Sequence, residues 1–489
     1  PKEGVKTKVR LMGGSYNQEQ YALMNEGRQG NIYWRASYQK DHIGDYKDAH
    51  GEKFTQSNQS HTASFMIGDE IDSHNDIRLA YDTYRANVAY ADSNKFWRNN
   101  PEWEYKWGYW NNKGGRGKLT RFGHRSFDSF RAIWDNKIND NWKHSLHVAR
   151  SEFKTSDFDP LKNPTGAFVN DPTSLDVRTI QVGDQVTYTK GKHTVVGGFE
   201  WEQSQAISVD NHKVTNTAYY VQDAYKVAPK WTITPGIRID HHSTFGSHTS
   251  PHMTVGYDVN DNTNVYVGYN RFFVAPTPYQ LYANSTWYDG NANLKPESGY
   301  EWSAGVHHKW NKRLSGNASV FTRKTSNKIT SDYVLATGKY TYYNASKENA
   351  HGFTADITNR ISNDWSTRLA YTYLYTHTPG KINNARGYLP KHEVVLGVDY
   401  AHNKWDAHFD MRVVANRRGA MENFFPRNSY AIANLAANYQ ATKDIKVFGA
   451  VNNLFDTYYA ENSNVYGTNF NDWWSMPGRN YRFGVELSF

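Results

Sequence analysis

One segment of the sequence, residues 97–125, interleaves aromatic rings with basic side chains. The residues that we single out there are Trp103, Tyr105, Trp107, Tyr109, Trp110 and Arg116. Aromatic faces stack on flat rings and on cations, and guanidinium groups pair with anions. The pattern therefore suits a ligand that is both anionic and aromatic. A nucleic acid offers the same chemistry, and phosphates of lipid headgroups are alternative partners for Arg121 and Arg125.

Two further segments are rich in aromatic residues. The stretch "FFVAPTPYQLYANSTWYDGNANLKPE", residues 272–297, contains Tyr279, Tyr282, Trp287 and Tyr288. A second stretch near the C-terminus contains Trp473 and Trp474. These rings could stack on a ligand. The alternative is that aromatic residues in a loop pack against one another and keep the loop folded.

Four carboxylates offer a possible calcium site, because calcium prefers oxygen ligands. They are Asp157, Asp159, Asp171 and Asp176, and they lack the regular spacing of a known calcium loop. The chain has 20 histidines and no cysteine, so thiolate metal sites and disulfides are excluded. We therefore expect no cofactor held by the chain itself, apart from this possible calcium ion.

Strands with two different faces must position these segments. Residues 231–240 place Trp231, Ile233, Pro235, Ile237 and Ile239 on one face of a strand. The opposite face carries Thr232, Thr234, Arg238 and Asp240, and residues 365–375 alternate in the same way. A soluble sandwich and a membrane barrel with a wet interior both fit this alternation.

Composition narrows the choice. The 489 residues have a mean hydropathy of -0.82 and no apolar run long enough for a spanning helix, which needs about 18 residues. Aromatic residues make up 15% of the chain, which argues against disorder. A transmembrane β-barrel remains possible, because only every second residue of its strands is apolar. The net charge of +8 favours anionic partners without choosing one.

The spacing of short turns predicts 22 strands. Ten short turns alternate with connections that are often much longer, at residues 26–31, 73–76, 137–141, 189–192, 226–230, 260–263, 310–313, 361–364, 402–404 and 441–444. An even number of antiparallel strands, with short turns at one end and long loops at the other, is typical of an outer-membrane barrel. Five tryptophans beside the short turns predict an aromatic girdle: Trp142, Trp231, Trp310, Trp365 and Trp405.

Several motifs resemble those of TonB-dependent outer-membrane receptors. They are "AYYVQDAYKVAPKWTITPGIRIDHH" (218–242), "FVAPTPYQLY" with "NANLKPE" inside 272–297, "VNNLFDTYY" (451–459) and the terminal "PGRNYRFGVELSF" (477–489). The resemblance implies an all-β, 22-stranded antiparallel transmembrane barrel in the outer membrane of a diderm bacterium, with short periplasmic turns and long extracellular loops. Residues 97–125 then belong to the third outer loop, the four calcium candidates to the fourth, residues 272–297 to the seventh, and Trp473 and Trp474 to the eleventh.

The resemblance also implies partners. Members of the family carry a plug domain before the barrel, whereas this sequence begins strand one near Lys6, so we expect residues 1–489 to form a single barrel domain with no plug. A plug that is truncated or supplied as a separate polypeptide would complete the receptor. Through that plug the TonB–ExbB–ExbD complex would supply energy. Lipopolysaccharide, outer-membrane lipids and the barrel assembly machinery are further expected partners, and a nucleic acid is not.

For function, we expect high-affinity uptake of a scarce nutrient. A ferric catecholate siderophore, an anionic aromatic metal chelate, fits the third loop best. Haem and cobalamin are alternatives within the family, although no histidine lies between Pro276 and Asn291, where haem receptors usually have one. An unplugged passive channel is the alternative from another class. The sequence has no G-x-S-x-G, H-E-x-x-H or Gly-rich phosphate loop, so we do not expect an enzyme.

Overall fold

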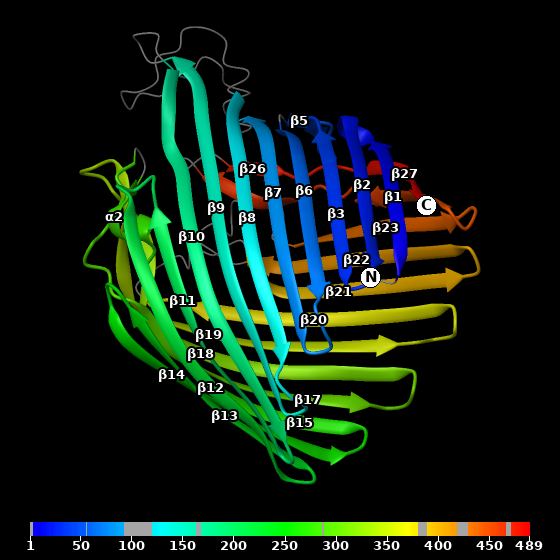
Figure 1. Cartoon of the computed structure of the whole chain (residues 1–489). Helices are drawn as coiled ribbons and strands as arrows, with labels where there is room; N and C mark the ends of the chain where they lie inside the picture. The colour runs from blue at the N-terminus through cyan, green and yellow to red at the C-terminus, as the bar shows by residue number, and fades with distance from the viewer. Residues whose placement is uncertain are drawn as a thin grey trace.

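The structure, a computed structural model, describes residues 3–54, 56–91, 120–162, 168–285, 288–379, 389–417, 429–465 and 471–489. These residues form a closed antiparallel β-barrel of 22 strands, as the sequence predicts (Figure 1). The wall strands are β1 (Gly4–Gly14), β2 (Gln18–Gln29), β3 (Ile32–Ile43), β6 (Gln56–Glu70), β7 (Asn75–Ala91), β8 (Thr120–Lys137), β9 (Trp142–Lys162), β10 (Phe168–Lys190), β11 (His193–Ala206), β12 (His212–Ala228), β13 (Trp231–His242), β14 (Gly246–Asn260), β15 (Thr263–Val274), β17 (Glu297–Lys309), β18 (Leu314–Val334), β19 (Lys339–Asn359), β20 (Trp365–His377), β21 (Pro390–His402), β22 (Trp405–Arg417), β23 (Tyr430–Gln440), β24 (Ile445–Asn452) and β27 (Asn480–Ser488).

Short elements decorate the outer loops. They are η1 (Ser15–Asn17), β4 (Tyr46–Lys47), β5 (Lys53–Phe54), α2 (Pro278–Tyr282), β16 (Tyr288–Asp289), β25 (Ala460–Val465) and β26 (Asn471–Ser475). Within the described residues, no helix is long and apolar enough to cross a membrane.

The barrel closes between the first and last wall strands. β27 lies between β24 and β1, and its residues from Arg482 to Ser488 pair with residues from Lys8 to Gly14. The backbone N–H of Tyr481 donates to the hydroxyl of Ser15 at 2.9 Å, beyond the end of the ladder. Closure satisfies the backbone groups of both terminal strands, which lipid could not do.

All ten predicted short turns are present, and side chains stabilise several of them. Asn139 Oδ1 accepts hydrogen bonds from the backbone N–H groups of Asn141 and Trp142 at 2.9 and 3.1 Å. Asn311 does the same for Arg313 and Leu314 at 2.8 and 3.0 Å. Such side chains mimic a backbone turn, which is why Asn, Asp, Ser and Thr mark these positions in the sequence.

The predicted tryptophan girdle forms a repeated pair beside the short turns. Four of its tryptophans contact a tyrosine on the neighbouring strand, with ring centroids 4.4 to 4.7 Å apart: Trp142 with Tyr188, Trp231 with Tyr257, Trp365 with Tyr400, and Trp405 with Tyr439. All five girdle tryptophans are exposed on the outer face. Amphipathic rings at this level mark the periplasmic membrane interface.

The lumen wall is charged, as the alternation predicts. Arg131 pairs with Asp82 at 2.7 Å, and Arg238 pairs with Glu200 at 2.7 Å. Tyr220 and His252 line a recess beside Arg238. A polar inner face and an apolar outer face are the arrangement of a water-filled barrel in lipid.

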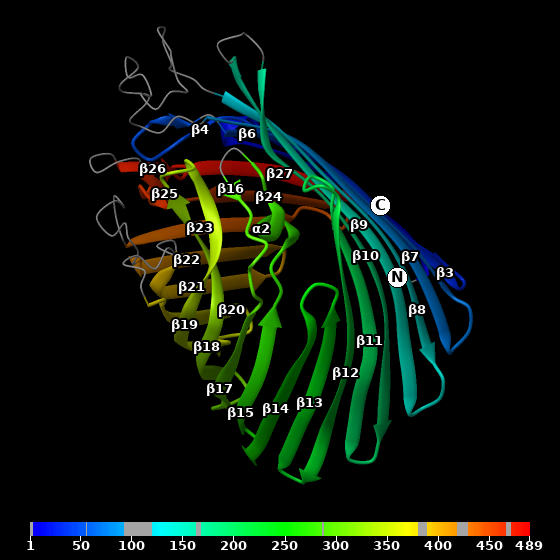
Figure 2. The same ribbon diagram turned by 90° about the vertical axis from the view of Figure 1, so that its left-hand side faces the viewer.

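The wall is not equally tall all round. β9 and β10 are 21 and 23 residues long, whereas β24 and β27 are 8 and 9 residues long. The long strands rise above the rest of the rim in Figures 1 and 2. This corrects one prediction: the backbone of Asp157, Asp159, Asp171 and Asp176 lies in β9 and β10 and not in a loop, because the antiparallel ladder continues into the aqueous phase.

Candidate ligand-binding surface at the outer mouth

The seventh outer loop, residues 275–296, has a defined fold. Its helix α2 begins with a capping box, in which the backbone N–H of Gln280 donates to Thr277 Oγ1 at 3.2 Å and the backbone N–H of Thr277 donates to Gln280 Oε1 at 2.9 Å. Leu281 and Leu294 are buried. The backbone N–H of Gly290 donates to the carbonyl of Ala283 at 2.6 Å. These contacts hold the aromatic residues of the loop in fixed places.

Tyrosines of this loop pack against the β18–β19 hairpin, and we call the group the tyrosine cluster: Tyr279, Tyr288, Tyr333, Tyr340 and Tyr342. The ring of Tyr288 stacks on Tyr340 and Tyr342, with centroids 5.4 and 5.6 Å apart. Tyr279 meets Tyr288 and Tyr342 edge-on at 6.2 and 6.5 Å. Tyr333 meets Tyr340 edge-on at 5.3 Å. Tyr333 and Tyr340 are exposed, whereas the other three rings are partly buried beneath them.

Polar contacts fix the cluster from both sides. Asn291 Nδ2 donates to the carbonyl of Tyr342 at 2.9 Å, and Lys339 Nζ pairs with Asp289 at 2.8 Å. Burial, and beside it the neighbouring Tyr340, raises the pKa of the Tyr288 phenol. The phenol of Tyr288 is therefore more firmly neutral than a free tyrosine at physiological pH.

Two histidines at the mouth stack on tyrosines. His212, at the start of β12, lies on the ring of Tyr282 with centroids 3.9 Å apart. His50, in the second outer loop, lies on Tyr458 at the same distance. Neither histidine belongs to a metal-binding group: among the described residues, no three His, Asp or Glu side chains come together to hold a metal ion.

The "VNNLFDTYY" motif ties the eleventh outer loop to the wall. Asn453 is buried, in a left-handed conformation with φ of 50°. Its Nδ2 donates to the carbonyls of Thr457 and Pro477 at 2.9 and 3.2 Å, and its Oδ1 accepts from the N–H of Thr457 at 2.8 Å. One side chain therefore joins the first part of the loop to its return.

The second and eleventh outer loops form one packed unit. Tyr46 in β4 donates through its hydroxyl to the carbonyl of Ser475 at 2.6 Å. The carbonyl of Ala460 accepts from buried Arg417 at 2.6 Å. Burial, and beside it the charge of Glu461, raises the pKa of the Tyr459 phenol. These contacts hold the two loops together on this side of the mouth.

The structure describes only part of the predicted ligand site. Tyr279 and Tyr282 lie in α2 and Tyr288 in β16, all engaged in ring packing as the alternative interpretation allowed. Trp473 and Trp474 lie in β26, where only their backbone is described, paired with β25. Outside the described residues lie Trp103, Tyr105, Trp107, Tyr109, Trp110, Arg116 and Trp287.

Of the four calcium candidates, only the side chain of Asp176 is described. Its carboxylate pairs with Lys154 at 3.6 Å. The calcium site stays a prediction for Asp157, Asp159 and Asp171, whose side chains lie outside the described part of the chain.

Sequence reasoning missed the tyrosines of the eighth outer hairpin. Tyr333, Tyr340 and Tyr342 are separated from the seventh loop by a complete strand pair, and only the fold brings them against Tyr288. A local signal did exist, because "YTYY" at residues 340–343 is unusually rich in tyrosine beside a turn. Tyrosine supplies a large ring with a polar end, which suits a binding surface.

The closed barrel, its girdle and its aromatic mouth define an outer-membrane barrel of the receptor type. The family model of TonB-dependent receptor-like β-barrels matches residues 13–454, and the chain belongs to that family.

Individual relatives are more distant. The iron-regulated outer membrane virulence protein of Vibrio cholerae is 26% identical over 329 residues, covering 61% of this chain and 48% of that protein. The ferrienterobactin receptor of Escherichia coli is 21% identical over 425 residues, covering 72% and 55%. The vitamin B12 transporter BtuB of Photobacterium profundum is 24% identical over 274 residues, covering 54% and 43%. The chain thus spans about half the length of the curated relatives it matches.

Solved structures support the same architecture. The ferric enterobactin receptor of Pseudomonas aeruginosa superposes with a TM-score of 0.79 at 14% identity, over 100% of this chain and 81% of that chain. At this identity the similarity establishes the fold and not the ligand.

Proposed function

We propose that this chain is the barrel of a TonB-energised receptor that captures a ferric siderophore at its outer mouth. The observation that carries the proposal is the tyrosine cluster, which presents the exposed rings of Tyr333 and Tyr340 over a packed layer. Catecholate rings stack on such faces. The names of two relatives, an iron-regulated protein and a ferrienterobactin receptor, support the same class of ligand.

Capture and release fall to different parts of the assembly. The rigid rings lose little conformational freedom when a ligand binds, since Tyr288 and Tyr342 already hold Tyr340 in place. The third loop would add Trp103, Trp107 and Arg116, with Arg116 pairing with the negative charge of the chelate. A plug domain, coupled to TonB–ExbB–ExbD, would then release the ligand into the polar lumen.

Cobalamin is the second candidate ligand, because a vitamin B12 transporter is among the relatives. Cobalamin has no catechol ring and no comparable negative charge, so the basic third loop favours the siderophore. The two ligands can be compared directly on one preparation.

The test is a fluorescence titration of the barrel together with its plug. A ferric tris-catecholate should quench the fluorescence at lower concentration than cyanocobalamin or haem. Each lost ring contact, about 0.5–1.5 kcal/mol, should weaken binding roughly two- to twelve-fold. We therefore expect this loss for Tyr340→Ala, and none for Tyr219→Ala, an exposed tyrosine on the outer face of β12.

The third loop provides the decisive variant. If the triple change of Trp103, Trp107 and Arg116 to alanine leaves siderophore binding intact, the siderophore proposal is wrong. Conductance across a planar bilayer separates a receptor from a passive channel. A barrel that conducts ions steadily with its plug present would contradict the receptor.

A further inference from the structure

A band of charged side chains crosses the outward face of four neighbouring strands. We call it the charged belt: Arg85 in β7, Asp128 in β8, Arg150, Glu152 and Lys154 in β9, and Asp176 and Arg178 in β10. Strand alternation places Arg85 on the same face as exposed Leu79 and Tyr81, and Arg150 on the same face as exposed Val148. The belt therefore faces the membrane side of the wall and not the lumen.

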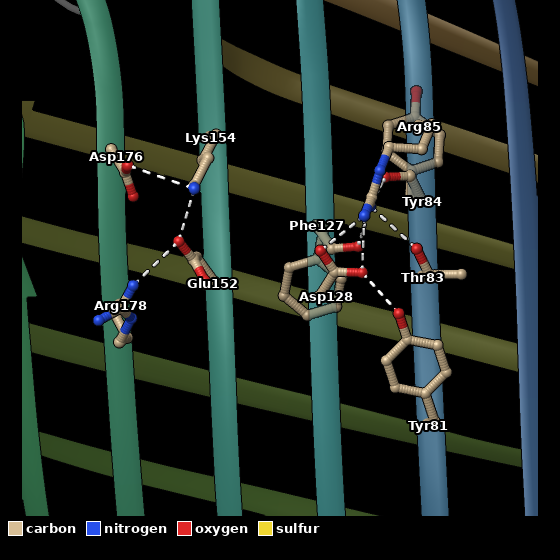
Figure 3. A network of polar contacts seen from close by, with 10 residues as sticks. All are labelled: Tyr81, Thr83, Tyr84, Arg85, Phe127, Asp128, Glu152, Lys154, Asp176 and Arg178. Carbon is tan, nitrogen blue, oxygen red and sulfur yellow. Dashed lines mark hydrogen bonds and ion pairs between the residues drawn. The ribbon is translucent and has the colours of Figure 1, made fainter.

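Ion pairs order most of the belt (Figure 3). Arg85 Nη2 donates to both carboxylate oxygens of Asp128, at 2.9 and 2.7 Å, and the Tyr81 hydroxyl donates to Asp128 at 2.8 Å. Lys154 pairs with Glu152 at 2.7 Å and with Asp176 at 3.6 Å.

These ion pairs connect neighbouring strands, because Glu152 in β9 also accepts a hydrogen bond from Arg178 in β10 at 3.3 Å. The side chains are thus held against the wall before any partner arrives.

The belt retains positive charge after this pairing. It contains four cations and three carboxylates, which leaves a net charge of +1. Arg150 is exposed and has no hydrogen bond or ion pair within the described part of the chain. An exposed guanidinium without a carboxylate is free to bind an anion with its full set of donors.

The belt lies at the level of the outer-leaflet headgroups. Arg150, Glu152 and Lys154 follow the girdle residue Trp142 by 8, 10 and 12 positions in one strand. At about 3.3 Å per residue and a tilt of about 40°, they lie roughly 20–30 Å above the girdle, where an apolar band about 25 Å tall ends. Glu152 and Lys154 lie at the headgroups, and the long side chain of Arg150 reaches up to them from just inside the apolar band.

At the same height above the girdle, the outward face of β20 carries aromatic residues and not charged ones. In β20, Tyr373 lies 8 positions beyond the girdle residue Trp365, as Arg150 does beyond Trp142. Its outward neighbours Tyr371 and Tyr375 are also aromatic, and Tyr371 bonds His392 at 2.8 Å. The chain of ion pairs across β9 and β10 therefore has no counterpart at this level of β20, a strand that is described in full, and it does not follow from height alone.

We propose that the charged belt binds the phosphates of the glycolipid that forms the outer leaflet. Guanidinium groups match phosphate oxygens with two parallel hydrogen bonds, and Lys154 adds a point charge. The carboxylates orient the cations, while the hydroxyl of Tyr81 lies beside them for the sugar. The sequence suggested Arg125 for this role. Alternation along β8, however, places Arg125 on the lumen face, whereas Asp128 is on the outward face. The inference concerns lipid only and does not depend on the imported ligand.

The experiment is a native mass-spectrometry titration of the intact chain in detergent. The probes are diphosphorylated lipid A, monophosphorylated lipid A and phosphatidylglycerol. We expect diphosphorylated lipid A to bind more tightly than the other two. Arg150→Gln should weaken its binding at least about five-fold. The change breaks no bond of the described structure, so heat-modifiable gel mobility should show a folded barrel.

Lys40→Gln is the matched control. Lys40 lies in β3, 8 positions beyond Ile32 and on the same face as exposed Tyr38, and the change removes the same charge at a similar level. It should leave lipid A binding unchanged. Equal losses for both variants, no loss for Arg150→Gln, or equal binding of phosphatidylglycerol and lipid A would each overturn the proposal.

Discussion

Replacing Asn453 by alanine should loosen the eleventh outer loop by a calculable amount. The change deletes three side-chain hydrogen bonds to Thr457 and Pro477 at a position that is 3% exposed. At about 0.5–1.5 kcal/mol for each bond, the loss is about 1.5–4.5 kcal/mol. Alanine at a φ of 50° adds roughly 1 kcal/mol, since Asn tolerates the left-handed region better.

Glycine at the same position separates these two contributions. Asn453→Gly deletes the same bonds but accepts the left-handed backbone, so it should cost about 1 kcal/mol less than alanine. Asn452→Ala is the matched control. That neighbouring residue makes one side-chain hydrogen bond, to Asn480 at 2.9 Å, so its loss should cost about 1 kcal/mol.

The assay is reversible urea unfolding of the barrel in lipid vesicles, followed by tryptophan fluorescence. Protease cleavage of the eleventh loop gives a local readout that does not require global unfolding. If Asn453→Ala and Asn452→Ala have equal free energies of unfolding and equal cleavage rates, the role assigned to the Asn453 carboxamide is wrong.

Three further predictions test other parts of the molecule. A Cβ at Gly290 would lie 2.5 Å from a backbone nitrogen of α2, so Gly290→Ala should cost about 1–3 kcal/mol of stability and speed proteolysis of the seventh loop. In the control Gly256→Ala the nearest atom to the added Cβ is 3.8 Å away, so neither effect is expected. Burial raises the pKa of the Tyr288 phenol, so the stability that the neutral phenol contributes is complete below about pH 10 and is lost as the pH rises through the folded pKa. Proteolysis of the seventh loop should therefore speed up in an alkaline step, and Tyr288→Phe should abolish this step. A step that persists in the variant would belong to another group. A double-mutant cycle on Trp365 and Tyr400 should give a coupling free energy of about 0.5–1.5 kcal/mol, and a value near zero would remove any energetic role for the girdle pairs.

The wall of the barrel was largely predictable from the sequence. Alternation along a strand such as β13 reports which face meets lipid, and turn chemistry acts over a few residues, as at Asn139 and Asn311. The first strand begins at Gly4, close to the predicted Lys6. Local patterns suffice here because each wall strand pairs mainly with its neighbours in the chain.

The mouth was less predictable for a physical reason. Tyr288 lies in the seventh outer loop and Tyr340 in the eighth outer hairpin, two wall strands further along the chain. No periodicity of the sequence relates residues placed in this way. The carboxylates at Asp157 and Asp171 were placed in a loop because polar strands above a membrane resemble loops in composition, yet their backbones pair. The third-loop residues stay a prediction.

Closure through β27 has a consequence for biosynthesis. Ser15 and Tyr481 are joined across 466 positions, so the ring cannot be completed before the last strand has been translated. Contacts this distant in sequence fold slowly, because the intervening chain must first be ordered. Until then β1 and β24 are open edges that invite pairing with other chains. The polypeptide must therefore be protected from aggregation from synthesis until it is inserted into the membrane. A chain shortened by its last nine residues could not close the barrel, so we expect it to be degraded and not inserted.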